Sequence, residues 1–107
     1  MRVLAYVPDL MDRSRISAVA GVSVEFVPSP AALTAAGPAD LIIVDLGRPG
    51  VLDVLPLVAG RTIGFGSHVD RDLLAAARAA GCSQVLARSA FFGGLGEILA
   101  GSGSEED

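Results

Sequence analysis

Two aspartates follow apolar runs at positions where their carboxylates could bind a cation. Asp45 closes the run Leu-Ile-Ile-Val at 41–44, and Asp9 comes after the first apolar run, behind Val7 and Pro8. Carboxylate oxygens are ligands of the kind that a hard divalent cation takes. If both runs are strands of one parallel sheet, these side chains meet at its carboxyl edge. We therefore expect Asp9 and Asp45 to approach closely enough to share a cation or a water.

Several other kinds of site are excluded by residue counts or by missing motifs. Cys82 is the only cysteine and His68 the only histidine, so an intramolecular disulfide and a Cys/His zinc site are both excluded. The chain contains neither a glycine-rich dinucleotide-binding motif nor a phosphate-binding P-loop motif. We interpret Cys82 as a packing residue and His68 as an exposed loop residue.

The chain as a whole alternates between strand-like and helix-like patterns. Short runs of branched apolar residues predict strands, and amphipathic or alanine-rich stretches bounded by Asp, Ser or Gly predict helices. The run 40–45 is the strongest strand, because consecutive branched residues indicate burial on both faces of a sheet. The predicted strands are 2–7, 22–27, 40–45, 61–65 and 83–87, and the predicted helices are 10–20, 30–36, 51–59, 70–80 and 90–100.

This alternation predicts a three-layer α/β fold. Right-handed crossovers place the five predicted strands in one doubly wound parallel sheet with helices on both faces. The common solution is the strand order 2-1-3-4-5, whose ligand site lies where the order reverses, at the carboxyl ends of strands one and three. We expect residues 1–100 to form a single domain and residues 101–107 to form a flexible acidic tail.

Three segments resemble response-regulator receiver domains, the CheY-like family with this flavodoxin-like fold. Residues 40–50 resemble the third strand of that family and the loop after it, with Asp45 at the strand end and a Pro-Gly pair following. Residues 67–70 resemble the loop after the fourth strand, and residues 80–91 resemble the fifth-strand segment. The resemblance covers residues 2 to about 100. It implies that Asp45 accepts a phosphoryl group, with Ser67 and Arg88 as the other members of the catalytic set.

The resemblance also implies a reduced magnesium site. The family places two or three acids just after the first strand, and only Asp9 remains there in this chain. Asp9, Asp45 and the carbonyl of Gly47 could supply three oxygens to Mg²⁺, so we expect a weakened site. Arg88 replaces a lysine whose point charge a planar guanidinium does not reproduce, and Ser67 lies one place after the expected hydroxyl position. An atypical receiver, or pseudo-receiver, is therefore predicted.

Each of these residues also has a purely structural interpretation. Asp9 or Asp12 could cap the first helix, and Ser67 could cap the helix that follows it. Arg88 could be a solvated or salt-bridged loop arginine. The sequence leaves these alternatives open.

Charge and hydropathy narrow the range of partners. All eight basic residues are arginines scattered along the chain without a basic stripe, so we expect no direct contact with nucleic acid. No stretch reaches the roughly 18–20 apolar residues that a membrane span needs, and the first residues lack the apolar core of a signal peptide. We expect a cytoplasmic protein that makes no membrane contact.

The last predicted helix carries more apolar surface than one helix can hide against a sheet. Phe91 and Phe92 are adjacent and cannot both face inward, so together with Leu95 they predict a contact face for a partner or a homodimer. Receiver domains commonly use the face of their fourth helix, fifth strand and fifth helix in this way, and the resemblance carries that face over to residues 70–99.

The predicted function is a stand-alone receiver-like module of two-component or phosphorelay signalling. It would act through contacts with a signalling protein or a second copy, with phosphorylation at Asp45 weak or lost. We expect at most a phosphoryl acceptor rather than an enzyme. The alternatives are a phospho-accepting response regulator that uses Asp45 with a reduced magnesium site, and a small-anion or metabolite binder at the same crevice.

Overall fold

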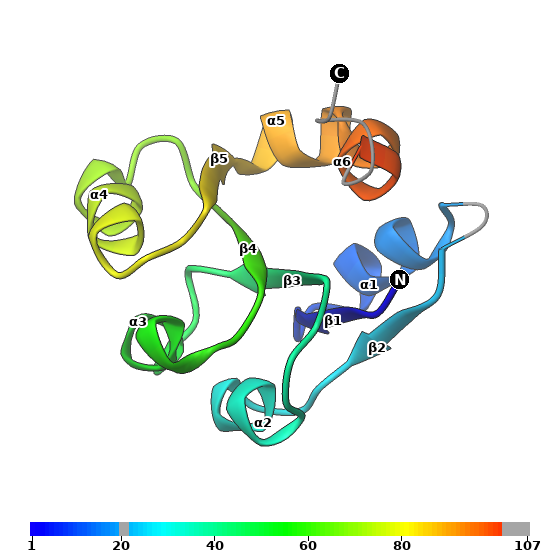
Figure 1. The fold of residues 1–107 in the computed structure, drawn as a ribbon. Coiled ribbons are helices and arrows are strands. Elements are labelled where there is room, and N and C mark those ends of the chain that lie inside the picture. Colours follow the sequence, from blue (N-terminus) through cyan, green and yellow to red (C-terminus); the bar gives the residue numbers. More distant parts are fainter. Residues whose placement is uncertain (20–21, 102–107) are drawn as a thin grey trace.

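The computed structural model describes residues 1–19 and 22–101 of the chain. Strands and helices alternate along the chain, as the sequence predicts (Figure 1). The helix predicted over 10–20 ends earlier, at Ser17, with Ala18 as its C-cap. Of the tail predicted over 101–107, Gly101 belongs to the last helix and residues 102–107 lie outside the described residues. The strands are β1 (Val3–Tyr6), β2 (Val24–Phe26), β3 (Leu41–Asp45), β4 (Arg61–Gly66) and β5 (Gln84–Ala87). The helices are α1 (Leu10–Ser17), α2 (Pro30–Ala35), α3 (Val51–Val54), α4 (Arg71–Ala79), α5 (Arg88–Gly93) and α6 (Leu95–Gly101).

The sheet is parallel throughout and has the strand order β2-β1-β3-β4-β5, which confirms the predicted topology. Strand β3 lies at its centre, paired on one side with β1 and on the other with β4. Every residue of β3 is buried, as expected for a central strand whose two faces are both covered by helices. The strand order reverses between β1 and β3, so the ends of these two strands define the crevice where such sheets bind ligands.

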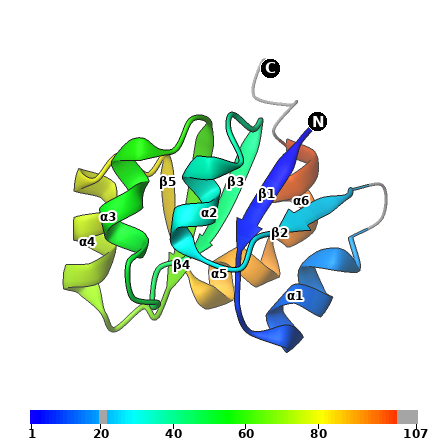
Figure 2. The same cartoon turned by 90° about the horizontal axis from the view of Figure 1, so that it is seen from below.

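Two apolar cores cover the two faces of the sheet. One core includes Leu33 of α2, Val51 of α3 and Ala77 of α4. The other includes Ile16 of α1, Phe91 of α5 and Leu99 of α6. Figure 2 shows α2 and α3 in front of the sheet and α5 and α6 behind it. The domain is therefore a three-layer sandwich, in agreement with the predicted fold class.

Two predicted helices are interrupted. The helix predicted over 51–59 consists of α3 and a 3-10 turn at Leu55–Leu57, because Pro56 cannot donate the hydrogen bond that an α-helix needs. The helix predicted over 90–100 is divided into α5 and α6 at Gly94. Gly94 closes α5 with a hydrogen bond from its amide to the carbonyl of Ala90, which is consistent with the weak helix propensity of this glycine-rich segment.

The aromatic residues of α5 lie mostly inside the domain. The Phe91 ring is fully buried and stacks on Phe65, with ring centroids 4.7 Å apart. Leu95 is also buried, whereas Phe92 is half-buried with its ring edge-on to both other rings. This corrects the expectation that Phe91 and Leu95 offer surface for a partner, because both side chains complete the core beside α1. The expectation for Phe92 stays a prediction.

Within residues 1–19 and 22–101, no helix is both long and apolar enough to span a bilayer.

Candidate functional site

Asp45 closes β3 with its carboxylate already engaged at both oxygens. The backbone amide of Gly47 donates to Oδ1 at 3.0 Å, and the Arg48 Nε donates to Oδ2 at 3.2 Å. Asp45 is only 7% exposed, whereas the Arg48 side chain is 40% exposed. The loop after β3 thus turns back on the strand end. A guanidinium now lies against the carboxylate that was the candidate phosphoryl acceptor.

Asp12 and Arg88 form the second ion pair of this edge. The Arg88 Nη1 and Nη2 donate to Oδ2 and Oδ1 of Asp12 at 3.1 and 2.7 Å, a bidentate arrangement. These hydrogen bonds also raise the pKa of the Arg88 guanidinium. Asp12 is 4% exposed and lies in the first turn of α1, while Arg88 begins α5, so the pair joins two helices on one face of the sheet. Both terminal nitrogens of Arg88 are therefore engaged by Asp12. This agrees with the structural interpretation of Arg88 as a salt-bridged arginine.

Asp9 is exposed and caps α1. Its Oδ1 accepts a hydrogen bond from the Asp12 amide at 3.0 Å, which is the main reason that the pKa of Asp9 lies below its ordinary value. The positive charges of Arg48 and Arg88 lower this pKa further. Asp9 therefore lies in the field of both guanidinium groups. Its cap role matches the structural interpretation of this residue.

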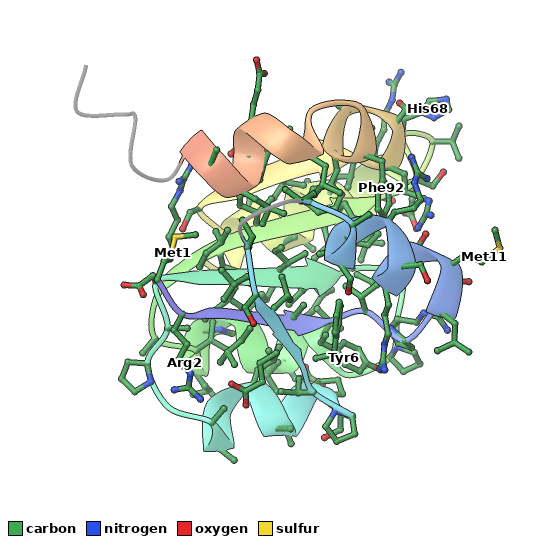
Figure 3. The ribbon with its side chains drawn as sticks, turned by 90° about the vertical axis from the view of Figure 1, so that its right-hand side faces the viewer. Met1, Arg2, Tyr6, Met11, His68 and Phe92 are labelled. Atoms are coloured by element: carbon green, nitrogen blue, oxygen red, sulfur yellow. The ribbon has the colours of Figure 1, made fainter. Side chains whose placement is uncertain are left out.

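Ser67 lies in the exposed loop after β4. Its hydroxyl accepts a hydrogen bond from the Val69 amide at 3.4 Å, and Asp70 rather than Ser67 caps α4. Gly66 occupies the buried end of β4, where a hydroxyl was expected. His68 is exposed as predicted, at the periphery of the domain in Figure 3.

The donor set at this edge does not fit a magnesium ion. No group of three or more His, Cys, Asp or Glu side chains within the described part of the chain is placed to hold a metal. A cation at Asp45 would have to displace Arg48 or lie beside its positive charge, which costs Coulomb energy in a mostly buried setting. Whether Asp9, Asp45 and the Gly47 carbonyl can gather round an ion once Arg48 leaves stays a prediction.

Two members of the edge were missed by sequence reasoning. Asp12 was considered only as a helix cap, and Arg48 only as part of the loop motif. Their spacing carried a signal, since Asp12 lies one helical turn after Asp9 and Arg48 three residues after Asp45. No signal in the sequence indicated that Asp12 pairs with Arg88, because Arg88 is 76 residues away in the chain.

Comparison with solved structures shows which known proteins share this architecture. A response regulator from Hahella chejuensis superposes with a TM-score of 0.82 and 23% identity, covering 99% of this chain and 97% of its own. A response regulator from Thermotoga maritima gives a TM-score of 0.75 at 16% identity, covering 97% of this chain and 98% of its own. This chain has the fold of response-regulator receiver domains.

The receiver fold is recognised by structure alone. No protein-family model matches the chain, and no curated protein matches its sequence significantly. Another solved receiver-fold structure is the Mn²⁺-bound form of the response regulator Rcp1, with a TM-score of 0.66 and 16% identity over 97% of this chain and 92% of its own. In this chain, Arg48 pairs with Asp45 at the end of β3, and Arg88 pairs with Asp12 in the first turn of α1.

Proposed function

We propose that this chain is a receiver-type signal-transduction module that acts through protein contacts, with phosphoryl transfer to Asp45 weak or absent. The observation that carries the proposal is the Arg48 guanidinium on Asp45, 3.2 Å from Nε to Oδ2. The receiver fold supports the signalling class, and the ion pair argues against efficient chemistry at the strand end.

Phosphoryl transfer to a carboxylate makes two demands on the site. One carboxylate oxygen must be free to attack, and positive groups must neutralise the charge that gathers on the phosphoryl oxygens. In this chain both Asp45 oxygens accept hydrogen bonds, and Arg88 neutralises Asp12 instead. Each cation that could assist the transfer is already paired with an acid. Neither arginine is thus free to neutralise an incoming phosphoryl group.

Exposed apolar side chains support a docking role. Leu10 and Met11 at the start of α1 are 74% and 78% exposed, and Val69 in the loop before α4 is 74% exposed. Side chains of this size in water stabilise a complex when a partner covers them. All three follow the carboxyl ends of strands, beside the acids and arginines described above. We assign this rim as the contact surface for a signalling protein or a second copy.

The proposal is tested by offering the chain a small-molecule phosphoryl donor. Purified protein is incubated with acetyl phosphate and Mg²⁺, and the intact mass is followed with Asp45→Asn as the blank. We expect little phosphorylation of the wild type and a magnesium-dependent gain in Arg48→Ala, where Asp45 is released. Stoichiometric phosphorylation of the wild type at Asp45 would instead support the alternative of a phospho-accepting regulator.

Docking is tested separately by sedimentation velocity over a concentration series. If a second copy is the partner, the wild type associates and Met11→Ser weakens the association. Leu57→Ser serves as the matched control, because Leu57 is 64% exposed but belongs to the turn after α3. A wild type that stays monomeric at every concentration rejects the second copy as the partner.

A further inference from the structure

A surface pocket of about 480 Å³ lies between α1 and α5. Arg15 lines it from α1, and Arg88, Ser89, Phe92 and Gly93 line it from α5. Figure 3 shows Phe92 between these two helices. Neither Asp9 nor Asp45 belongs to the lining, so Arg88 is the one residue that the pocket shares with the edge described above.

Two guanidinium groups converge on the Phe92 ring at this pocket. The Cζ atom of Arg15 lies 4.1 Å from the ring centroid, and that of Arg88 lies 5.2 Å from it. A guanidinium held against an aromatic face keeps its N–H groups free at its own edge for an acceptor. Two like charges beside one ring repel each other unless negative charge lies nearby. Asp12 already offsets the charge of Arg88, so the attraction for an anion comes mainly from Arg15.

The charge balance selects the kind of anion. Arg88 is neutralised by Asp12, whereas no ion pair is found for Arg15 within the described residues. One uncompensated positive charge matches a singly charged group better than a doubly charged one. A planar carboxylate also fits the edge of a guanidinium with two parallel hydrogen bonds.

We propose that this pocket binds a carboxylate. Arg15 would be its main partner, and the Ser89 hydroxyl and the Arg88 Nε would be the further donors. The pocket is open to solvent and has room for a short organic acid or for one acidic side chain of a partner. This site shares Arg88 with the edge described above, but it does not require phosphoryl transfer to Asp45 or the docking rim.

The test is an NMR titration of the ¹⁵N-labelled full chain with sodium acetate, at ionic strength held constant with sodium chloride. We expect saturable shifts at Arg15, Ser89 and Gly93. Arg15→Gln should weaken binding by about tenfold or more, since it removes a charge-assisted pair. Arg71→Gln is the matched control, because Arg71 is an exposed arginine of α4 and the variant has the same net charge.

A second variant blocks the pocket without changing its charge. A Cβ atom built at Gly93 meets nothing within 4 Å, so Gly93→Leu is expected to fold and to fill the space that acetate would occupy. Loss of acetate binding in this variant, with an unchanged circular dichroism spectrum, supports the pocket as the site. Unchanged binding overturns it.

Two further titrations identify the source and class of the ligand. N-acetylaspartate amide presents the carboxylate of an acidic side chain, so tighter binding than acetate indicates a partner protein and weaker binding indicates a free organic acid. Tighter binding of inorganic phosphate overturns the carboxylate assignment. The pocket is rejected as a binding site if the shifts never saturate. It is also rejected if Arg15→Gln and Arg71→Gln weaken acetate binding equally.

Discussion

At the scale of single residues, the Asp12–Arg88 pair differs from an ordinary surface ion pair. Asp12 is almost fully shielded, so removing its charge leaves Arg88 without its bidentate partner. The Arg88 side chain is 43% exposed, however, and water screens part of the interaction. The expected cost is therefore smaller than the loss from breaking a fully buried pair.

Asp12→Asn should lower the free energy of unfolding by about 1–2 kcal/mol, the range of a charge-assisted hydrogen bond discounted for solvent. Urea denaturation at neutral pH measures the change. Asp53→Asn is the control, since Asp53 is an exposed acid in the first turn of α3. Equal effects of the two substitutions would show that the contact with Arg88 adds nothing to stability.

Asp9 makes the stability depend on pH on the acid side. Its pKa is lowered in the folded state, so its contribution is present above the pKa of the unfolded chain, near 3.9, and is lost as the pH falls through the lower folded value. Asp9→Asn keeps a side chain that caps helices but removes this titration. We expect the urea midpoint of the wild type to fall more steeply than that of Asp9→Asn below about pH 4. Parallel curves would contradict this.

At the scale of elements, the glycines of the chain divide into two kinds. Gly96 lies inside α6, and a Cβ atom there would meet nothing within 4 Å. Gly60 precedes β4 with a φ of +143°, and a Cβ atom there would lie 2.2 Å from the Ala39 carbonyl oxygen. The first glycine weakens a helix, whereas the second permits a close approach of two backbone segments.

Gly96→Ala should therefore stabilise the domain by about 0.5–1 kcal/mol, because alanine has the higher helix propensity and meets open space. Gly60→Ala should destabilise it, since the added methyl group meets the backbone in a conformation that alanine avoids. Thermal unfolding followed by circular dichroism compares both variants with the wild type. A loss of stability in Gly96→Ala would contradict the propensity argument.

Elements were predictable from the sequence to the extent that local pattern determines them. The branched apolar run at 41–44 identified the central strand, and the alternation predicted a parallel sheet whose common strand order is the one observed. The break at Gly94 was missed, since glycines only weaken a helix and the actual stop depends on packing. The packing of Phe91 and Phe92 was equally unpredictable, because no local pattern indicates which of the two rings stacks on Phe65.

The candidate site was predictable to a smaller extent. Asp9 and Asp45 were predicted because ligands bind where the strand order of such a sheet reverses, and this rule depends only on topology. The partners of the site residues depend on side-chain placement across the fold. No periodic pattern in the sequence predicts the ion pair between Asp12 and Arg88. The same holds for the ion pair between Arg48 and Asp45. The family resemblance did point to Arg88, but as a phosphoryl contact rather than as the partner of Asp12.

At the scale of the whole molecule, the central position of β3 has a consequence for how the domain opens. Every residue of β3 is buried, and the strand is paired on both sides. Strand β2 has three residues, none of them buried, and forms an edge of the sheet. Fluctuations that detach β2 cost little, whereas exposing β3 requires the sheet and both cores to separate.

Amide hydrogens should therefore exchange with deuterated water at very different rates along the sheet. The amides of Leu41–Asp45 should exchange only when the whole domain unfolds, so their protection should equal the global free energy of unfolding. The amides of Val24–Phe26 should exchange earlier, through local opening. Exchange followed by mass spectrometry of short peptides measures both, and equal rates in the two strands would contradict the prediction. If the rates differ as expected, β2 is the edge strand at which a partner will most easily add a strand or a loop to this domain. Amide exchange in β3 will then report the unfolding of the whole domain, even while such a partner is bound at β2.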